Sequence, residues 1–359
     1  MPNRQAEHDR TLVDYFKLQA EACRQLDSPL TAGLVDHMAS DYIARGPVYS
    51  LLHDWPTSPV ADAIALRMTG ALHGAALTGR DVPLMAAYKE ANHGQLDMAA
   101  LWPRARDFLA REPDWVRDYL KYAPQTNEAR RSILLLVGFL HLAQQFDMDI
   151  HMLELGASAG LNMNWDKFRY ELDDWSWGPA SPVTLSTPWT GPAPPTDAPL
   201  RIASRAGCDI NPLDLEDETE RTRLRSYCWT DVPGRLARLD GAIEIARAEG
   251  TQPEKSGAAD WLERKLATRP THGLTVVYHS IFLQYPPQSE RERIETLMAQ
   301  AGAKATSHAP LAWVRFEPET LLSGEPNILE PALETISWPG GQSKILARSN
   351  GHVTYVEAN

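Results

Sequence analysis

The sequence predicts an α/β fold in two parts. An all-helical N-terminal domain covers residues 1–146, and a mostly parallel sheet with a C-terminal antiparallel hairpin covers residues 147–359. Three observations predict this division. Apolar residues recur every three to four positions through the first part. Short apolar runs then alternate with helical patterns, which is typical of a parallel sheet. Near the end of the chain, turn residues separate short strands.

The bulk composition indicates a globular protein. The 359 residues are enough for two domains, and 43% of them are hydrophobic. The formal net charge of −12 argues against a dedicated nucleic-acid binder, because phosphate contacts need a basic face. The chain begins without the apolar core of a signal peptide, and no apolar run approaches the roughly 20 residues that span a bilayer. We therefore expect a cytoplasmic protein with no membrane segment, and we make no prediction of its oligomeric state.

The N-terminal part is predicted to be helical throughout. Its clearest helix opens at Ser58, because serine can cap a first turn and the following Pro59 fits the first helical position. Gly79 is a suitable residue to close this helix. Between these ends runs one apolar stripe, which consists of Val60, Ile64, Met68, Leu72 and Ala76.

A second helical run, over residues 133–140, is apolar on nearly all sides, which predicts a buried helix. Polar residues precede it, and two interpretations of them are open. In the first, Thr126 or Asn127 simply caps the helix. In the second, Gln125 and Asn127 line a ligand pocket.

The second part alternates strands and helices. The expected strands cover residues 150–155, 200–209, 273–278 and 311–316, and the expected helices cover 217–224, 233–248, 258–267 and 290–301. The proline- and tryptophan-rich stretch at about 165–199 is interpreted as an insertion, with a small hairpin between 168–172 and 183–185. Residues 339–341 and 350–351 predict the turns of the C-terminal antiparallel hairpin.

The stretch around which the chain is organised covers residues 149–162. Its strand ends at Glu154, and Gly156 and Gly160 then permit a tight turn in which a ligand can touch bare backbone. We expect N–H groups at the start of the following helix to face that ligand. Because ligands of open α/β sheets bind beyond the carboxyl ends of the strands, this turn predicts a nucleotide-type site.

Three interpretations of the turn are open, and the first is a cofactor loop for S-adenosylmethionine. Small residues from Gly156 to Gly160 would let the backbone approach that cofactor closely. An acid at the end of the next strand would hold its ribose hydroxyls. Asp209 ends the next expected strand, whereas Asp173 lies nearer to the usual spacing of about 20 residues but follows no good strand. We therefore predict Asp209 as the ribose contact.

The second interpretation is an esterase of the α/β-hydrolase type. Residues 156–160 also match G-x-S-x-G, the nucleophile elbow, in which Ser158 would attack an acyl carbon. The histidines available to activate it are His279, His308 and His352. However, a hydrolase sheet places several strands before the elbow, whereas the preceding part is predicted to be helical. The third interpretation is a non-enzymatic protein with a nucleotide-binding fold that binds a ligand or partner.

Other polar residues are candidates for the same site. His279 follows the best strand, 273–278, at the edge where α/β proteins place reacting groups. It is either a general base or substrate contact, or a structural histidine at the sheet edge. Asn127 and Gln284 are the other catalytic candidates, and Asn162 is a candidate cofactor contact. No cluster of His, Cys or carboxylate residues has a spacing that demands a metal.

Several blocks of the sequence together resemble a known bacterial family. They are residues 153–160, 162–170, 207–214 and 278–280, with 124–128, 223–229 and 338–341 in addition. The family consists of uncharacterised proteins, is catalogued as a domain of unknown function, and is grouped with class I S-adenosylmethionine-dependent methyltransferases. The resemblance covers nearly the whole chain. It implies a Rossmann-like sheet of the class I methyltransferase type with a helical N-terminal extension.

The resemblance also implies roles for individual residues. By similarity to class I methyltransferases, the cofactor loop would consist of Glu154, Gly156, Ala157, Ser158 and Gly160, with Asp209 as the ribose contact. Alanines stand at positions 157 and 159, where a middle glycine is common in methyltransferases, and they narrow the room for a ligand. Methyl transfer is an in-line displacement that depends on positioning, so it does not require an acid–base pair. The expected function is methyl transfer from S-adenosylmethionine to an unknown acceptor.

Overall fold

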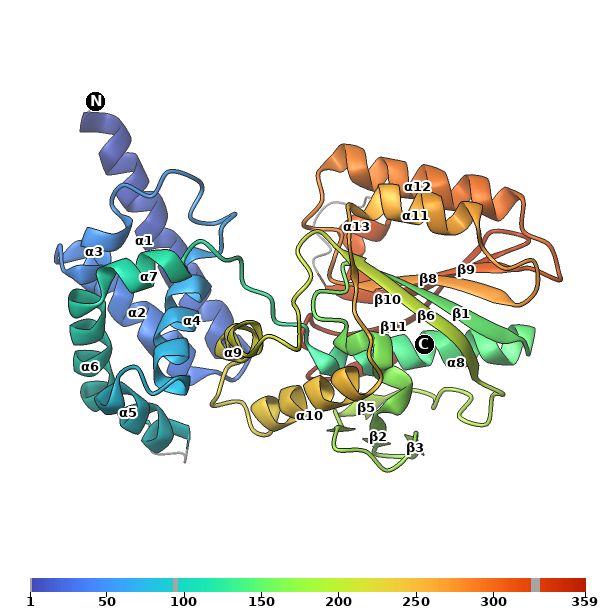
Figure 1. Cartoon of the computed structure of the whole chain (residues 1–359), viewed down its shortest axis with the longest axis horizontal. Helices are drawn as coiled ribbons and strands as arrows, with labels where there is room; N and C mark the ends of the chain where they lie inside the picture. Colours follow the sequence, from blue (N-terminus) through green and yellow to red (C-terminus); the bar gives the residue numbers. More distant parts are fainter. Residues whose placement is uncertain (1, 93–95, 324–329) are drawn as a thin grey trace. The chain divides into compact units, whose positions relative to one another are not determined.

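The computed structural model describes residues 2–92, 96–323 and 330–359 (Figure 1). The chain divides into two compact units, of which the first consists of Met1–Thr126 and Asp217–Ala237 and the second of Asn127–Glu216 and Arg238–Asn359. This division differs from the expected boundary at residue 146 in two respects. The buried helix that contains residues 133–140 belongs with the sheet, and a later segment of the chain joins the helical unit.

The described residues of the first unit form helices and no strands. Its helices are α1 (Pro2–Gln25), α2 (Pro29–Ile43), α3 (Pro47–Leu52), α4 (Ile64–Leu77), α5 (Val82–Asn92), α6 (Met98–Arg111), α7 (Pro113–Tyr119) and α9 (Glu218–Ser226). They bury a large apolar cluster, to which Phe16, Met38, Leu72 and Phe108 belong. The predicted helical character of this part is therefore confirmed.

The predicted start of one helix, at Ser58, is wrong. Turns occupy this segment, and α4 begins only at Ile64. The Asp62 carboxylate holds the turns in place because it accepts a hydrogen bond from the indole nitrogen of Trp55 (2.9 Å). As a result Val60, which the predicted stripe included, is 51% exposed.

The second unit is built on one nine-stranded sheet, in the order β5-β12-β11-β10-β9-β8-β1-β6-β7. Its strands are β1 (Asp149–Leu155), β5 (Trp189–Thr190), β6 (Arg201–Asp209), β7 (Glu254–Lys255), β8 (Leu274–Ser280), β9 (Leu311–Pro318), β10 (Pro331–Trp338), β11 (Gln342–Arg348) and β12 (Val356–Ala358). Strands β7, β6, β1, β8 and β9 run parallel, and β10, β11 and β12 form an antiparallel extension. A mostly parallel sheet with antiparallel C-terminal strands is thus confirmed.

The order of the parallel strands determines where a site can lie. From β7 to β9 along the sheet, the five parallel strands are the third, second, first, fourth and fifth of the set in chain order. The order therefore reverses between β1 and β8. In open α/β sheets, ligands bind at the carboxyl ends of the strands beside such a reversal. Glu154 on β1 pairs with Gly207 of β6 on one side and with Tyr278 of β8 on the other. The ends of these three strands therefore meet at one edge.

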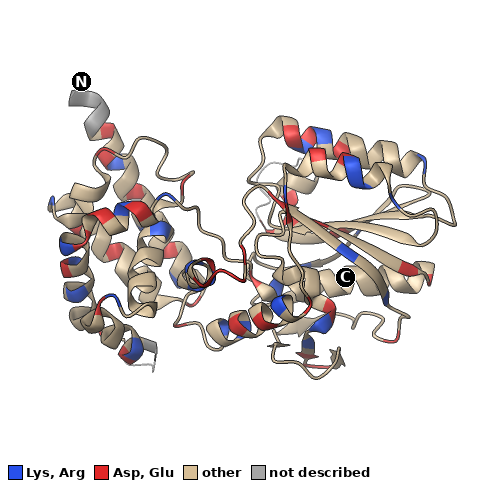
Figure 2. Ribbon diagram, in the orientation of Figure 1, with Lys and Arg blue, Asp and Glu red and all other residues tan. Residues whose placement is uncertain are grey.

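Helices cover both faces of this sheet (Figure 1). Helix α8 (Ser132–Phe146) lies on one face, and α11 (Ala258–Ala267) and α12 (Gln288–Ala303) lie on the other. Helix α8 approaches β9 so closely that a Cβ atom on Gly138 would lie 2.8 Å from a methyl group of Val314. Helix α10 (Arg235–Ala248) precedes β7, and the short α13 (Glu319–Ser323) follows β9. Lysine, arginine, aspartate and glutamate residues lie mainly on helices and loops, and few lie on the strands of the sheet (Figure 2).

The insertion forms a small sheet of its own. It contains β2 (Arg169–Leu172), β3 (Trp175–Trp177) and β4 (Thr184–Leu185), in the order β3-β2-β4. The predicted hairpin between 168–172 and 183–185 is wrong, because β2 pairs antiparallel with β3 and parallel with β4. Asp173 and Asp174 separate β2 from β3, and a loop of two residues is the length that hairpins prefer. None of the helices in the described ranges is long and apolar enough to cross a membrane.

Candidate functional site

The centre of the candidate site is a tight turn, residues 156–160, that follows β1. Three of its residues have positive φ angles, which are 67° at Gly156, 54° at Ser158 and 76° at Gly160. The turn leads into η2 (Leu161–Lys167), a 3-10 helix whose first five residues are buried. The predicted strand and turn are present, but the helix that follows is short and tightly wound.

Three N–H groups of the turn already have acceptors within the protein. Ala157 N–H donates to the carbonyl of Cys208 (2.9 Å), and Gly160 N–H donates to the carbonyl of Ala157 (2.7 Å). Ser158 N–H donates to Oδ2 of Asp209 (2.8 Å). The expectation that the turn leaves its main-chain donors open to a ligand is therefore wrong for these three groups.

Asp209 ends β6 and is bonded to the turn. Its Oδ2 accepts from Ser158 and its Oδ1 accepts from the N–H of Asn211 (2.8 Å). A carboxylate has about four lone-pair sites, so this half-exposed side chain retains capacity to accept hydrogen bonds from a ligand. Asp173, the alternative ribose contact, lies between β2 and β3, where its Oδ2 accepts from the N–H of Trp189 (3.4 Å). Of the two candidates, Asp209 is the one that contacts the turn.

Glu154 is buried where β1 leads into the turn, with only 3% of its surface exposed. The hydroxyl of Tyr278 donates to its Oε2 (3.2 Å) and also to the carbonyl of Asn162 (3.4 Å). The pKa of Glu154 is raised to about 8, chiefly because the side chain is buried; the Tyr278 hydrogen bond lowers it and the negative charge of Asp209 raises it. Glu154 therefore holds its proton through most of the neutral range.

Within the described residues, neither Glu154 nor Asp209 forms an ion pair with a lysine or arginine. Two acidic side chains thus lie beside one turn of small residues with no protein cation between them. A positively charged ligand would be attracted by the negative charge of Asp209, and it would favour the ionised form of Glu154. An anionic group such as a pyrophosphate would be repelled.

The ring of Phe282 covers one side of the turn. A Cβ atom on Gly156 would lie 2.3 Å from this ring, so only glycine fits there. Two fully buried residues at the ends of β8 and β9 hold Phe282 in place. Oε1 of Glu317 accepts from the N–H of Phe282 (2.7 Å) and bonds Nδ1 of His279 (2.7 Å).

This arrangement indicates a structural role for His279. Its ring is fully buried and lies 5.5 Å from the ring of Phe282, and its Nε2 has no hydrogen-bond partner among the described residues. The position of His279 agrees with the structural alternative, in which it supports the sheet edge. Gln284, by contrast, is exposed in the loop that follows β8.

Asn127 and Asn162 both bond backbone beside the turn. Nδ2 of Asn127 donates to the carbonyl of Ala157 (2.8 Å), and Nδ2 of Asn162 donates to the carbonyl of Glu128 (3.4 Å). The short helix η1 (Ala129–Arg131), which precedes α8, is capped by the Glu128 side chain and not by Asn127. The sequence pointed to both asparagines through their polarity, but it did not indicate that they connect two segments.

The geometry does not assemble the triad of a hydrolase. The hydroxyl of Ser158 has no hydrogen-bond partner among the described residues. His279 pairs with Glu317 instead, and the chain order serine–histidine–acid differs from the serine–acid–histidine order of α/β-hydrolases. In the described part of the chain, no group of three or more His, Cys, Asp or Glu side chains is arranged to hold a metal ion.

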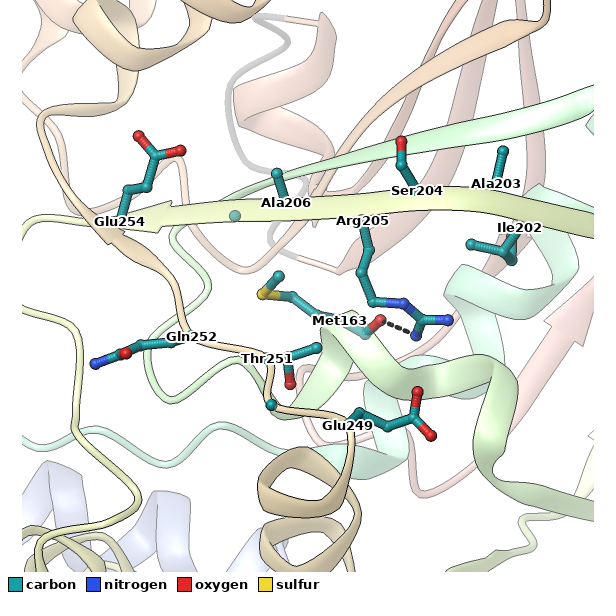
Figure 3. A pocket seen from close by; sticks show the side chains of 12 residues that line it. Met163, Ile202, Ala203, Ser204, Arg205, Ala206, Glu249, Thr251, Gln252 and Glu254 are labelled. Carbon is teal, nitrogen blue, oxygen red and sulfur yellow. Dashed lines mark hydrogen bonds between the residues drawn. The ribbon is translucent and has the colours of Figure 1, made fainter.

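A groove of about 520 Å³ runs along β6 (Figure 3). It is lined by Met163, residues 202–207, residues 249–252 and Glu254. Arg205 crosses it and donates to both carboxylate oxygens of Asp166 (2.7 and 3.0 Å) and to the carbonyl of Met163 (2.8 Å). No sequence motif pointed to this groove, because its walls come from segments far apart in the chain.

Comparison with known proteins identifies a family and no activity. A family model described as "Uncharacterized protein conserved in bacteria (DUF2332)" matches residues 13–357, which is nearly the whole chain. Neither a curated protein nor a solved structure matches the chain.

The contact between Gly156 and Phe282 predicts that Gly156→Ala costs more folding free energy than Gly250→Ala. The two glycines have similar φ angles, 67° and 62°, so each substitution incurs a left-handed backbone penalty of about 1 kcal/mol. Only Gly156 adds a clash, because a Cβ atom on Gly250 would meet nothing within 4 Å. Equilibrium urea unfolding of both variants measures the difference. Equal losses of stability would contradict the packing of Phe282 on the turn.

Burial of Glu154 predicts that the stability of the protein falls as the pH rises. Its pKa is about 8 in the folded chain against an ordinary value of 4.5, so the native state keeps a proton that the unfolded chain releases between these values. The stabilisation is complete below pH 4.5 and is lost as the pH rises to about 8. Thermal melting from about pH 5 to about pH 9 should show a smaller decline for Glu154→Gln than for the wild type.

The matched control for this experiment is Glu171→Gln, which changes an exposed glutamate on β2. This variant should follow the wild type at every pH. The same pH dependence in the wild type and in Glu154→Gln would contradict a buried, protonated Glu154.

Proposed function

The chain belongs to this bacterial family, and we propose that it is an S-adenosylmethionine-dependent methyltransferase acting on an unidentified acceptor. The observation that carries the proposal is the pair of acidic side chains, Glu154 and Asp209. They lie beside a turn of small residues, and neither has a cationic partner within the described residues. S-adenosylmethionine carries a positive sulfonium and a positive ammonium group, which such a site would attract.

The topology supports a Rossmann-like assignment. The parallel strands β7, β6, β1, β8 and β9 follow the order third, second, first, fourth and fifth in the chain. Dinucleotide-binding sheets have the same strand order. The turn follows the first strand of that set, and Asp209 ends the strand beside it. In such sheets the phosphate- or cofactor-binding turn follows the first strand, and an acid farther along the chain bonds the ribose.

The charges favour S-adenosylmethionine over a dinucleotide. NAD and FAD need N–H groups at a helix N-terminus for their pyrophosphate. Here the N–H groups of Ala157, Ser158 and Gly160 bond within the protein, and the following helix is a short 3-10 helix. The negative charge of Asp209 would repel a pyrophosphate in addition. A cationic ligand without phosphates is therefore the better match.

Each residue of the site has a defined part in this proposal. The small side chains from Gly156 to Gly160 let the ligand lie close to the backbone, and Asp209 accepts hydrogen bonds from its ribose hydroxyls. Glu154, which is neutral when the protein stands alone, ionises beside the positive charge. The bound cofactor supplies an electrophilic methyl group. Because methyl transfer is an in-line displacement, positioning by these residues supplies much of the rate.

The proposal predicts that S-adenosylmethionine binds and that its affinity rises with pH up to about 8. Glu154 must lose its proton to ionise, so binding near pH 7 should release protons. Titration calorimetry in buffers with different ionisation enthalpies measures this release. The wild type should release protons on binding, and Glu154→Gln should not. Failure of the wild type to bind would overturn the proposed function.

Asp209→Asn should weaken the binding of S-adenosylhomocysteine about tenfold or more. Hydrogen bonds to a charged group contribute about 1.5–3 kcal/mol, and 1.4 kcal/mol corresponds to a factor of ten. Asp173→Asn is the control, since that side chain lies in the small sheet. Calorimetry on both variants, with melting curves to verify folding, compares them. A larger loss for Asp173→Asn would move the ribose contact into the insertion.

A further inference from the structure

Three oxygen atoms beside the turn have no hydrogen-bond partner among the described residues. They are the amide oxygens of Asn127 and Asn162 and the hydroxyl of Ser158, and all three are shielded from solvent. Asn162 as a whole is only 4% exposed. Buried polar groups in proteins nearly always have a partner, so unpartnered atoms of this kind call for an explanation. A group that donates hydrogen bonds would satisfy them.

Two short segments, residues 127–128 and 157–162, hold these oxygens in one neighbourhood. Asn127 donates its amide nitrogen to the carbonyl of Ala157 (2.8 Å), and Asn162 donates its amide nitrogen to the carbonyl of Glu128 (3.4 Å). With each nitrogen engaged by a carbonyl, each amide presents its oxygen as a remaining acceptor. Asn127 does so at a φ of 37°, an angle that residues other than glycine seldom adopt.

The carboxyl group of Glu154 lies next to the same set of atoms. The hydroxyl of Tyr278 donates both to Oε2 of Glu154 (3.2 Å) and to the carbonyl of Asn162 (3.4 Å). One hydroxyl thus connects the acid to the backbone of Asn162, whose side-chain oxygen is one of the three unpartnered atoms. This combination is complementary to a group with several N–H donors and a positive charge, and a primary ammonium has both.

We propose that Asn127, Ser158 and Asn162 form a subsite for the primary ammonium of the ligand. This inference rests on the proposed function and deepens it, because the ammonium belongs to the amino acid end of S-adenosylmethionine. A ligand that lacks the ammonium leaves these oxygens without donors, and sites of that kind discriminate strongly between related ligands. The three residues would therefore distinguish an adenosyl amino acid from a plain adenosyl thioether.

Two probes separate this subsite from the rest of the site. S-adenosylhomocysteine carries the amino acid end, whereas 5′-methylthioadenosine keeps the adenosyl thioether and lacks that end. Titration calorimetry on the full chain should show that the wild type binds the first probe at least about tenfold more tightly. Ser158→Ala and Asn162→Ala should each weaken binding of the first probe and leave binding of the second unchanged. Ser158→Ala removes only an unpartnered hydroxyl, so it tests the subsite without endangering the fold.

Asn164→Ala is the matched control, since Asn164 lies on the same 3-10 helix but has partners for its amide. It donates to the carbonyl of Gly160 and to Thr251, and it accepts from Arg205. The Asn164→Ala substitution should change the affinity for both probes by the same factor. Should Asn162→Ala fail to fold, Ser158→Ala carries the test alone, because it removes only an unpartnered hydroxyl.

The outcomes distinguish the subsite from the proposed function. Equal affinity of the wild type for the two probes would overturn the subsite and leave the proposed function standing. The same conclusion would follow if Ser158→Ala and Asn162→Ala changed the affinity for neither probe, or changed both affinities by the same factor. If the wild type binds neither probe and does not bind S-adenosylmethionine, the proposed function falls, and the subsite falls with it.

Discussion

The candidate site depends on one buried carboxyl group. It lies where β1 leads into its turn, and it has no positive partner among the described residues. Burial raises the pKa of Glu154 to about 8, and the hydroxyl of Tyr278 is the one group of the described residues that bonds its Oε2. Asp209 adds a second acid from the neighbouring strand and is held there by the N–H of Ser158. The edge of the sheet therefore holds two acidic side chains that pair with no lysine or arginine of the described ranges.

The surrounding residues maintain this arrangement through packing. Phe282 lies against Gly156, and the buried pair of His279 and Glu317 fixes the backbone of Phe282. The ends of β8 and β9 thus hold the shape of the turn after β1. A histidine at the end of a central strand is an obvious candidate for proton transfer, but its complete burial and its bond to Glu317 give it this supporting role.

Local sequence patterns predicted the elements of the fold, and contacts between distant segments decided the rest. Apolar runs predicted β1, β8 and β9, because buried parallel strands are continuously hydrophobic. Glycines at 156 and 160 predicted the turn, and both residues do have positive φ angles. No local pattern showed that Ser158 donates its N–H to Asp209 or that Phe282 covers Gly156, because these contacts join separate strand ends. The true start of α4 was missed because the bond from Trp55 to Asp62, which holds this segment in turns, has no signature in the apolar pattern.

The protonation state of Glu154 tests the central claim most directly. Infrared difference spectroscopy between the wild type and Glu154→Gln isolates the carbonyl stretching band of this one carboxylic acid. With Glu154 buried and without a cation, the band should be present near pH 7 and should disappear when S-adenosylmethionine is added. Absence of the band near pH 7 in the protein alone, or its persistence with the ligand bound, would contradict the account.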